Sequence, residues 1–123
     1  MKDITSRADI ELLVNSFYFK VKKDPTIGYI FNDVAKVNWD DHLPKMYSFW
    51  ESILFNVASF KGNPMSAHIV LSKKTTIASE HFDKWLLLWD QTIDAHFKGE
   101  RASNAKQRGK NIAGVMLYKI QNN

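Results

Sequence analysis

Histidine is the side chain with the clearest capacity for chemistry in this sequence, which contains four histidines and no cysteine. Without cysteine, the chain has no disulfide, iron–sulfur cluster, thiolate nucleophile or cysteine zinc site. No histidine pair lies at i, i+4 with a nearby glutamate, so the zinc-protease helix pattern is absent. Calcium loops, glycine-rich phosphate loops and serine nucleophile elbows are also missing. The sequence therefore gives no basis for ordinary hydrolase or kinase chemistry.

Two of the histidines lie beside apolar residues on separate predicted helices. His68 falls in KGNPMSAHIV, where Asn63-Pro64 predicts the cap and first turn of a short helix. His42 lies 68 − 42 = 26 residues earlier, on a line with Met46 and Phe49. Two helices that each present an imidazole to one cavity can hold a haem between them. Spacing alone leaves open the alternative that both histidines are core or boundary residues.

The elements that must position these histidines are helical. Apolar residues recur at helical spacing over residues 6–23, 38–57, 79–97 and 101–120, and two short helical pieces follow Asp24-Pro25 and Asn63-Pro64. Asn38 and Ser79 are predicted N-caps. Pro44 removes a backbone donor, so the second long helix must kink or start only near residue 43. With no convincing alternating strand, the sequence predicts an all-α fold.

The apolar faces of these helices are rich in aromatic side chains. The rings predicted to point inward are Phe17, Tyr18, Phe31, Phe49, Trp50, Phe82, Trp85 and Trp89. Plain core packing is one explanation, because aromatic side chains bury large areas. A flat aromatic guest explains the composition better, since a 123-residue core can close with much less ring surface.

Length and composition predict a single globular domain over residues 1–123, with 45% hydrophobic and 24% charged residues. No apolar run approaches the roughly 18 residues of a membrane span, and the N-terminus lacks the core of a signal peptide. We therefore expect a cytoplasmic protein without membrane contact. The net charge of +4 comes from scattered lysines and arginines, and Lys106, Arg108 and Lys110 alternate rather than share one helix face.

Five sequence segments occur in the order and rough spacing of a known family. They are FYFKVKKDPTIGYIFN (17–32), W-D-D-H (39–42), FW (49–50), GNPMSAH (62–68) and HFDKWLLLW (81–89). Together they resemble the truncated haemoglobins, in particular the third group, often called P, over nearly the whole chain. The resemblance implies a truncated globin fold, in which a two-over-two helical sandwich surrounds the haem.

The resemblance also implies roles for individual residues. His68 matches the proximal iron ligand of the NPM-x-x-H motif. Tyr18 and Trp85 match residues that face the bound ligand and donate hydrogen bonds to it, and Phe31 matches the phenylalanine that stacks on the haem. His42 matches the distal histidine, which gates entry, donates a third hydrogen bond or itself coordinates the iron. The remaining residues expected to bind the cofactor are Met46, Phe49, Trp50 and Met65.

The function that follows is binding of oxygen, carbon monoxide and nitric oxide by haem b (iron protoporphyrin IX), with an unidentified reductase as partner. Strong hydrogen-bond donors favour ligand activation or detoxification of nitric oxide or peroxide over oxygen transport. Peroxidase-like and nitric oxide dioxygenase activities remain open. We expect a monomer that does not bind nucleic acid; the alternative is a cofactor-free helical module with weak nucleic-acid affinity.

The chain departs from the family pattern at two places. The segment between His68 and Trp85 is a few residues longer than usual, which allows His81 to compete as the iron ligand. We favour His68, because its motif is intact and His81 falls in the first turn of its helix. Pro44 follows His42 closely, and a tilted helix start would move His42 relative to the haem.

Overall fold

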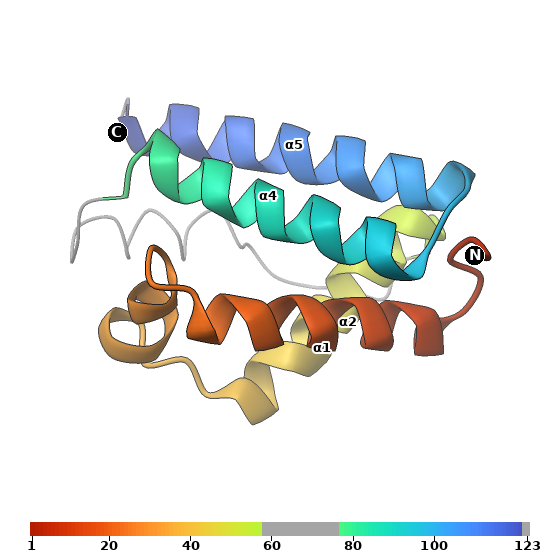
Figure 1. Cartoon of the computed structure of the whole chain (residues 1–123), viewed down its shortest axis with the longest axis horizontal. Helices are drawn as coiled ribbons and strands as arrows, with labels where there is room; N and C mark the ends of the chain where they lie inside the picture. The colour runs from red at the N-terminus through yellow and green to blue at the C-terminus, as the bar shows by residue number, and fades with distance from the viewer. Residues whose placement is uncertain (58–76, 122–123) are drawn as a thin grey trace.

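The computed structural model describes residues 1–57 and 77–121, and this part of the chain is helical without any strand. Its elements are α1 (Arg7–Lys23), the π-helix η1 (Ile30–Val34), α2 (Trp39–Leu54), α4 (Ser79–His96) and α5 (Glu100–Gln121). The four long helices form two layers, with α4 and α5 above α1 and α2 (Figure 1). The predicted all-α, two-over-two arrangement is confirmed.

Helix α1 lies between α2 and α4 and supplies the middle of the core. The Ser6 hydroxyl accepts the backbone N–H of Asp9 and caps the helix start. The predicted apolar stripe is buried along its whole length, from Ile10 to Val21. Tyr18 follows Phe17 on the edge of this stripe, which turns its phenol toward α2 rather than toward the centre of the core.

The turn after α1 brings Phe31 back toward Tyr18. The Asp24 carboxylate accepts the backbone N–H groups of Thr26 and Ile27 at 2.8 and 3.2 Å, and Lys84 of α4 pairs with it at 3.4 Å. A Cβ on Gly28 would lie 2.8 Å from the Lys22 carbonyl oxygen, so this close approach requires glycine. The predicted short helical piece is thus a turn followed by η1.

Helix α2 begins at Trp39, although Pro44 lies within it. The Asn38 side chain accepts the Asp40 N–H at 3.1 Å and donates to the Asp41 carboxylate, which confirms the predicted cap. The alternative that the helix starts only near residue 43 is wrong. Pro44 is exposed, so the carbonyl that loses its helical donor can be solvated. His42 therefore belongs to the first turns of a regular helix.

The start of α4 differs from the prediction by one residue. Ala78 holds the N-cap position and Ser79 is the first helical residue, so the predicted Ser79 cap is wrong. The His81 ring does the work of a capping side chain, because its Nδ1 accepts the Ala78 N–H at 2.9 Å. An imidazole placed three residues into a helix can reach back to the open backbone donors there.

The N-terminal segment closes the start of α5 (Figure 1). The Asp3 carboxylate accepts the backbone N–H groups of Arg101 and Ala102, each at 2.9 Å. Gly99 has a φ of 148°, and a Cβ there would lie 2.5 Å from the Asp3 side chain. Burial alone raises the pKa of Asp3, but the hydrogen bonds from three backbone N–H groups hold this pKa below its ordinary value.

Candidate functional site

Four aromatic side chains from three elements meet below α1, and we call them the Tyr18 cluster: Tyr18, Phe31, Trp39 and His42. The Tyr18 ring lies 5.3 Å from both the Trp39 and His42 rings and 5.9 Å from Phe31, centroid to centroid. Edge-to-face geometry predominates, which is the favoured arrangement of aromatic pairs. The structure thus brings together three predicted site residues, Tyr18, Phe31 and His42, from α1, η1 and α2.

Tyr18 is the most deeply buried member of this cluster, with 6% of its surface exposed. Burial raises the pKa of its phenol well above the ordinary value of 10.0, so the group keeps its proton at physiological pH. Within the described part of the chain, no hydrogen-bond partner is found for the phenol oxygen. The phenol is therefore a protonated donor at the edge of the core, ringed by Phe31, Trp39 and His42.

Phe17 connects the Tyr18 cluster to the tryptophans of α4. Its ring lies 4.9 Å from Tyr18, 5.4 Å from Trp85 and 5.0 Å from Trp89. Trp85 and Trp89 stack on each other at 6.0 Å with an interplanar angle of 12°. Tyr18 and Trp85, the two predicted donors, therefore flank the same phenylalanine.

The two tryptophans of α4 differ in what their indole N–H groups do. Trp89 is fully buried and donates to the Ala105 carbonyl of α5 at 3.0 Å. Trp85 is partly exposed, and among the described residues no acceptor is found for its N–H. Trp85 is therefore available as a donor to a ligand, whereas Trp89 is committed to the core.

Trp89 is the centre of a second group, the Trp89 core, formed by Trp50, Trp89, Ala105 and Gly109. Trp50 stacks on Trp89 at 4.4 Å, and a Cβ on Gly109 would come within 2.8 Å of the Trp89 ring. Trp50 was predicted to line the cofactor, but its closest ring contacts are with Trp89 and, at 5.5 Å, Phe49. Trp50 is 3% exposed, whereas the predicted lining residues Met46 and Phe49 are only partly buried.

The remaining histidines separate into different roles. His68 and Met65 lie outside the described residues. His81 caps the start of α4, and His96 is the last residue of that helix, beside Phe97. Within residues 1–57 and 77–121, no three histidine, aspartate or glutamate side chains gather closely enough to hold a metal ion. This absence does not conflict with the predicted iron ligand, because haem iron needs only one histidine and His68 lies outside the described residues.

Trp39 is a site residue that the sequence reasoning did not assign. Its indole stacks on Phe31 at 6.0 Å and meets the edge of His42 at 5.6 Å. The signal was its position three residues before His42, which places both on one helix face. The first residue of a helix is usually solvated, and nothing in the local pattern indicated a contact with Tyr18 or Phe31.

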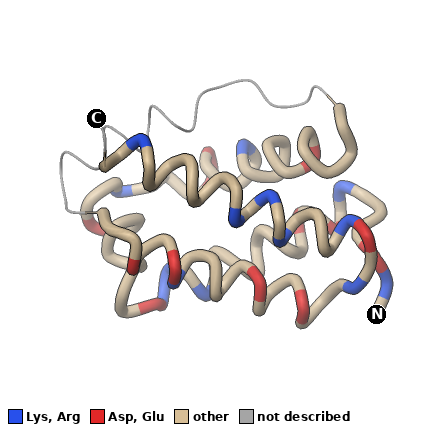
Figure 2. Tube along the Cα trace, turned by 90° about the horizontal axis from the view of Figure 1, so that it is seen from above, with Lys and Arg blue, Asp and Glu red and all other residues tan. Residues whose placement is uncertain are grey.

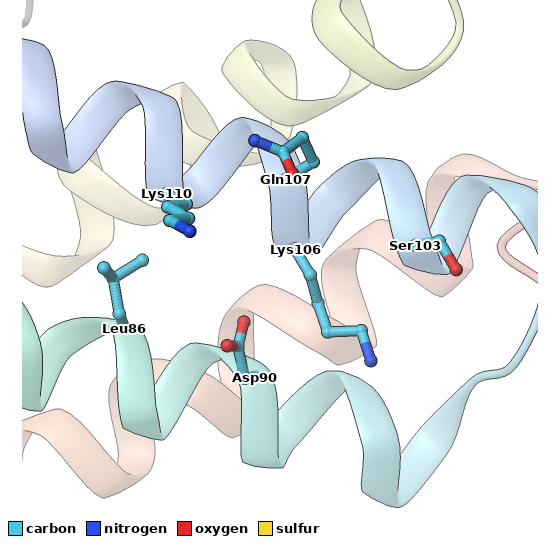
Figure 3. A pocket seen from close by; sticks show the side chains of 6 residues that line it. All are labelled: Leu86, Asp90, Ser103, Lys106, Gln107 and Lys110. Carbon is cyan, nitrogen blue, oxygen red and sulfur yellow. The ribbon is translucent and has the colours of Figure 1, made fainter.

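The described pocket lies elsewhere, in the groove between α4 and α5 (Figure 3). It has a volume of about 260 Å³, and its lining includes Leu86, Asp90, Lys106 and Lys110. Burial raises the pKa of Asp90, while Lys106 opposes this and Asp94 adds to it. No predicted site residue lines this groove, and its charged lining does not suit an apolar ring. The Tyr18 cluster is instead an aromatic group that contains three of the predicted site residues.

Charge is distributed so that opposite signs face each other on the upper layer. Lysines and arginines follow α5 and acidic residues follow α4 (Figure 2). Lys106 bonds to Asp94 at 2.7 Å, and Arg101 lies over the Phe55 ring. The basic side chains of α5 are therefore partly used within the protein. None of the described helices has the length and apolar character needed to cross a membrane.

Comparisons with known proteins agree with this geometry. No protein-family model matches the chain. It is 30% identical over 120 residues to the Group 3 truncated hemoglobin ctb of Campylobacter jejuni subsp. jejuni serotype O:2, a match that covers 93% of this chain and 92% of that protein. The crystal structure of a group III truncated hemoglobin from Campylobacter jejuni matches with a TM-score of 0.83 at 27% identity, over 98% of this chain and 95% of that one. The shared helices and the extent of the sequence match show that this chain belongs to the group III truncated haemoglobins.

Proposed function

We propose that this truncated haemoglobin holds haem b through His68 and binds oxygen and other diatomic ligands on the side of the Tyr18 cluster. Haem binding follows from the family in general terms, and when bound the haem supplies the iron that diatomic ligands require. The observation that carries the finer proposal is the Tyr18 phenol, which keeps its proton because burial raises its pKa and which lies among the rings of Phe31, Trp39 and His42. The protein's own groups orient the ligand and exclude water.

Tyr18 and Trp85 are the proposed hydrogen-bond donors. A diatomic ligand that gains negative charge on binding is stabilised by donors already aimed at it, and the effect is strongest where water is excluded. Tyr18 keeps its proton because burial raises its pKa, and an indole N–H never acts as an acceptor. Met46, Phe49 and Phe31 are proposed to provide the apolar walls, with Trp50 supporting Phe49 from behind.

His42 is proposed as the third distal residue. Its ring meets the edge of Tyr18 at 5.3 Å with an interplanar angle of 80°. The start of α2 at Trp39, before His42 and Pro44, supports this role. An imidazole beside the phenol can donate to a ligand, gate its entry or coordinate the iron when no ligand is present.

The choice of His68 over His81 as the iron ligand is supported by the cap of α4. An imidazole whose Nδ1 accepts the Ala78 N–H carries its proton on Nε2. Such a ring has no free lone pair for iron, and binding iron would uncap the helix. His81 therefore has a structural role, and His68 in its NPM-x-x-H motif remains the proposed ligand.

The donor set favours ligand activation or detoxification over transport. Donors that hold a charged ligand slow its release, and tightly held oxygen is poor cargo. We propose nitric oxide or peroxide as the substrates to test, with an unidentified reductase returning the iron to the ferrous state. We also propose a cytoplasmic monomer. The nucleic-acid alternative loses support, because Lys106 pairs with Asp94.

The decisive experiment compares His68→Ala with His81→Ala by ultraviolet–visible spectroscopy in the ferric, ferrous and carbonyl-bound states. We expect His68→Ala to lose most of its haem affinity. His81→Ala should keep the wild-type spectrum and lose about 1 kcal/mol of unfolding free energy with its cap. A wild-type spectrum in His68→Ala together with haem loss in His81→Ala would assign the iron to His81.

A further inference from the structure

Trp39 is a partly exposed member of the Tyr18 cluster. It is the first residue of α2, and its indole contacts the rings of Tyr18, Phe31 and His42. Tyr18 is 6% exposed, whereas Trp39 is only partly buried. The indole therefore has one side against the buried phenol and another side toward water.

A lysine from the neighbouring helix covers the indole. The Lys22 ammonium lies 4.4 Å from the centroid of the Trp39 ring, within the range of a cation–π attraction. The Lys22 carbonyl accepts the Asn32 side-chain N–H at 3.0 Å, which ties the end of α1 to η1. Lys22 thus connects the end of α1 to the start of α2 across the face of Trp39.

The backbone before Trp39 is suited to movement of this side chain. Residues 35–38 form no regular element, and Lys36 has a φ of 49°, in the left-handed region that side chains rarely adopt. The helix start is held by the Asn38 side chain, which accepts the Asp40 N–H, and by the Asn38 carbonyl, which accepts the N–H groups of Asp41 and His42. The Trp39 N–H is one of the first-turn donors that have no partner within the helix. Helix starts of this kind open at lower free energy than helix centres.

We propose that Trp39 is a gate on the ligand side of the pocket, latched by Lys22, that sets how fast diatomic ligands enter and leave. This inference rests on the proposed function of the Tyr18 cluster. When Trp39 is closed, its indole covers Tyr18 and holds His42 edge-on. When it swings out, three ring contacts and the latch are lost, so the open state is rare and ligand entry is slow.

Carbon monoxide association after flash photolysis of the haem-loaded ferrous protein tests the gate. Trp39→Ala should raise the association rate by about ten-fold or more. Trp39→Phe, which keeps a ring in the wall, should restore a rate near that of the wild type. Lys22→Met keeps the aliphatic stem but removes the charge, and it should raise the rate about two- to five-fold.

The chain contains a matched control for the latch. The Lys23 ammonium lies 3.9 Å from the Phe19 ring centroid, but Phe19 is 61% exposed and belongs to no predicted site. Lys23→Met removes a cation–π pair of the same kind and the same charge, so it should leave the association rate unchanged. Equal effects of Lys22→Met and Lys23→Met would overturn the latch, because the rate would then follow net charge.

Ionic strength gives a readout that a purely structural role would not change. Carbon monoxide is neutral, so salt does not steer its approach, but salt weakens a partly exposed cation–π pair. The wild-type rate should rise with salt, and the rate of Lys22→Met should not. In 5-fluorotryptophan-labelled protein, the Trp39 fluorine resonance, assigned with Trp39→Phe, should report a larger open population in Lys22→Met than in Lys23→Met.

The outcomes separate the gate from the haem site. An abnormal wild-type carbonyl spectrum would contradict the proposed function before any rate is measured. A normal spectrum with a Trp39→Ala rate within two-fold of the wild type, in a variant whose circular dichroism is unchanged, would overturn the gate alone. If Trp39→Ala does not fold, Trp39→Leu and the salt dependence provide the same decision.

Discussion

Trp85 and Trp89 lie one turn apart on α4 and stack on each other, yet they belong to different parts of the molecule. Trp89 is fully buried, its N–H has the Ala105 carbonyl as acceptor, and Trp50 covers its face. Trp85 is partly exposed and shares Phe17 with the Tyr18 phenol, and its own N–H finds no acceptor among the described residues.

The same contrast holds between the Trp89 core and the Tyr18 cluster as wholes. Both are built from aromatic rings at ordinary packing distances, so ring content does not distinguish them. The Trp89 core is buried throughout, whereas only Tyr18 is buried in the Tyr18 cluster. What differs is whether the polar atoms of the rings are satisfied within the protein. The Trp89 indole is paired with the Ala105 carbonyl, whereas the Tyr18 phenol is the donor that we propose for the ligand. Hydrogen-bond accounting therefore separates packing from function where composition does not.

The largest expected effect comes from removing the centre of the Trp89 core. Trp89→Ala should lower the free energy of unfolding by about 3–5 kcal/mol, because it leaves a cavity and removes the indole hydrogen bond to the Ala105 carbonyl. Urea unfolding of the carbonyl-bound protein measures this. Trp85→Phe is the comparison variant and should cost less than about 1 kcal/mol. Similar losses in the two variants would show that both tryptophans are core residues.

Tyr18→Phe tests the other side of the comparison. The substitution keeps the ring and removes a hydroxyl that has no partner in the described residues, so stability should change little. Oxygen dissociation should accelerate roughly 10- to 100-fold, as a charge-assisted hydrogen bond is lost. Stopped-flow displacement of oxygen by carbon monoxide gives the rate. A large loss of stability with an unchanged rate would place the Tyr18 phenol in the core instead.

The glycines of α5 provide a finer test of the Trp89 core. Gly109→Ala should lower the free energy of unfolding by about 1–3 kcal/mol, because the new Cβ would meet Trp89. Gly114→Ala on the same helix has no atom within 4 Å of the new Cβ and should stabilise the protein by about 0.4–1 kcal/mol. Thermal unfolding of both variants measures the difference. Equal shifts would mean that helix propensity alone decides.

The smallest expected effect is alkaline and belongs to the Tyr18 cluster. Because burial raises the pKa of Tyr18, the native state keeps a proton above pH 10 that the unfolded chain has lost. This contribution is complete below the ordinary pKa of 10.0 and is lost as the pH rises above it. Denaturant titrations between about pH 9 and about pH 11 should show a steeper loss of unfolding free energy in the wild type than in Tyr18→Phe. Parallel curves would mean that Tyr18 ionises freely.

The fold was accessible from the sequence because helical periodicity and caps are local signals. The stripe of α1 and the Asn38 cap required only neighbouring residues. The family resemblance was the basis for expecting contacts among Tyr18, Phe31 and His42, because these residues come from three separate elements. Residue patterns cannot express such contacts, because they depend on how helices pack.

Trp39 and His81 show where sequence reasoning stopped. Trp39 received no role from the sequence, because its place beside Tyr18 depends on Lys22 and Phe31 from other elements. His81 reads as an outward-facing residue and a rival iron ligand, but its Nδ1 caps α4. The sequence allowed two roles for the His81 side chain, and only its hydrogen bond to the Ala78 N–H in the folded protein distinguishes them.

The cap that Asp3 provides for α5 has a consequence for how the chain folds. Asp3 and the backbone N–H that it accepts from Ala102 are 99 residues apart, almost the full length of the chain. Contacts between such distant residues form late, because a long loop must close first. During synthesis, Asp3 is made long before the Ala102 N–H that it will accept. Until then, the start of α5 stays open to water.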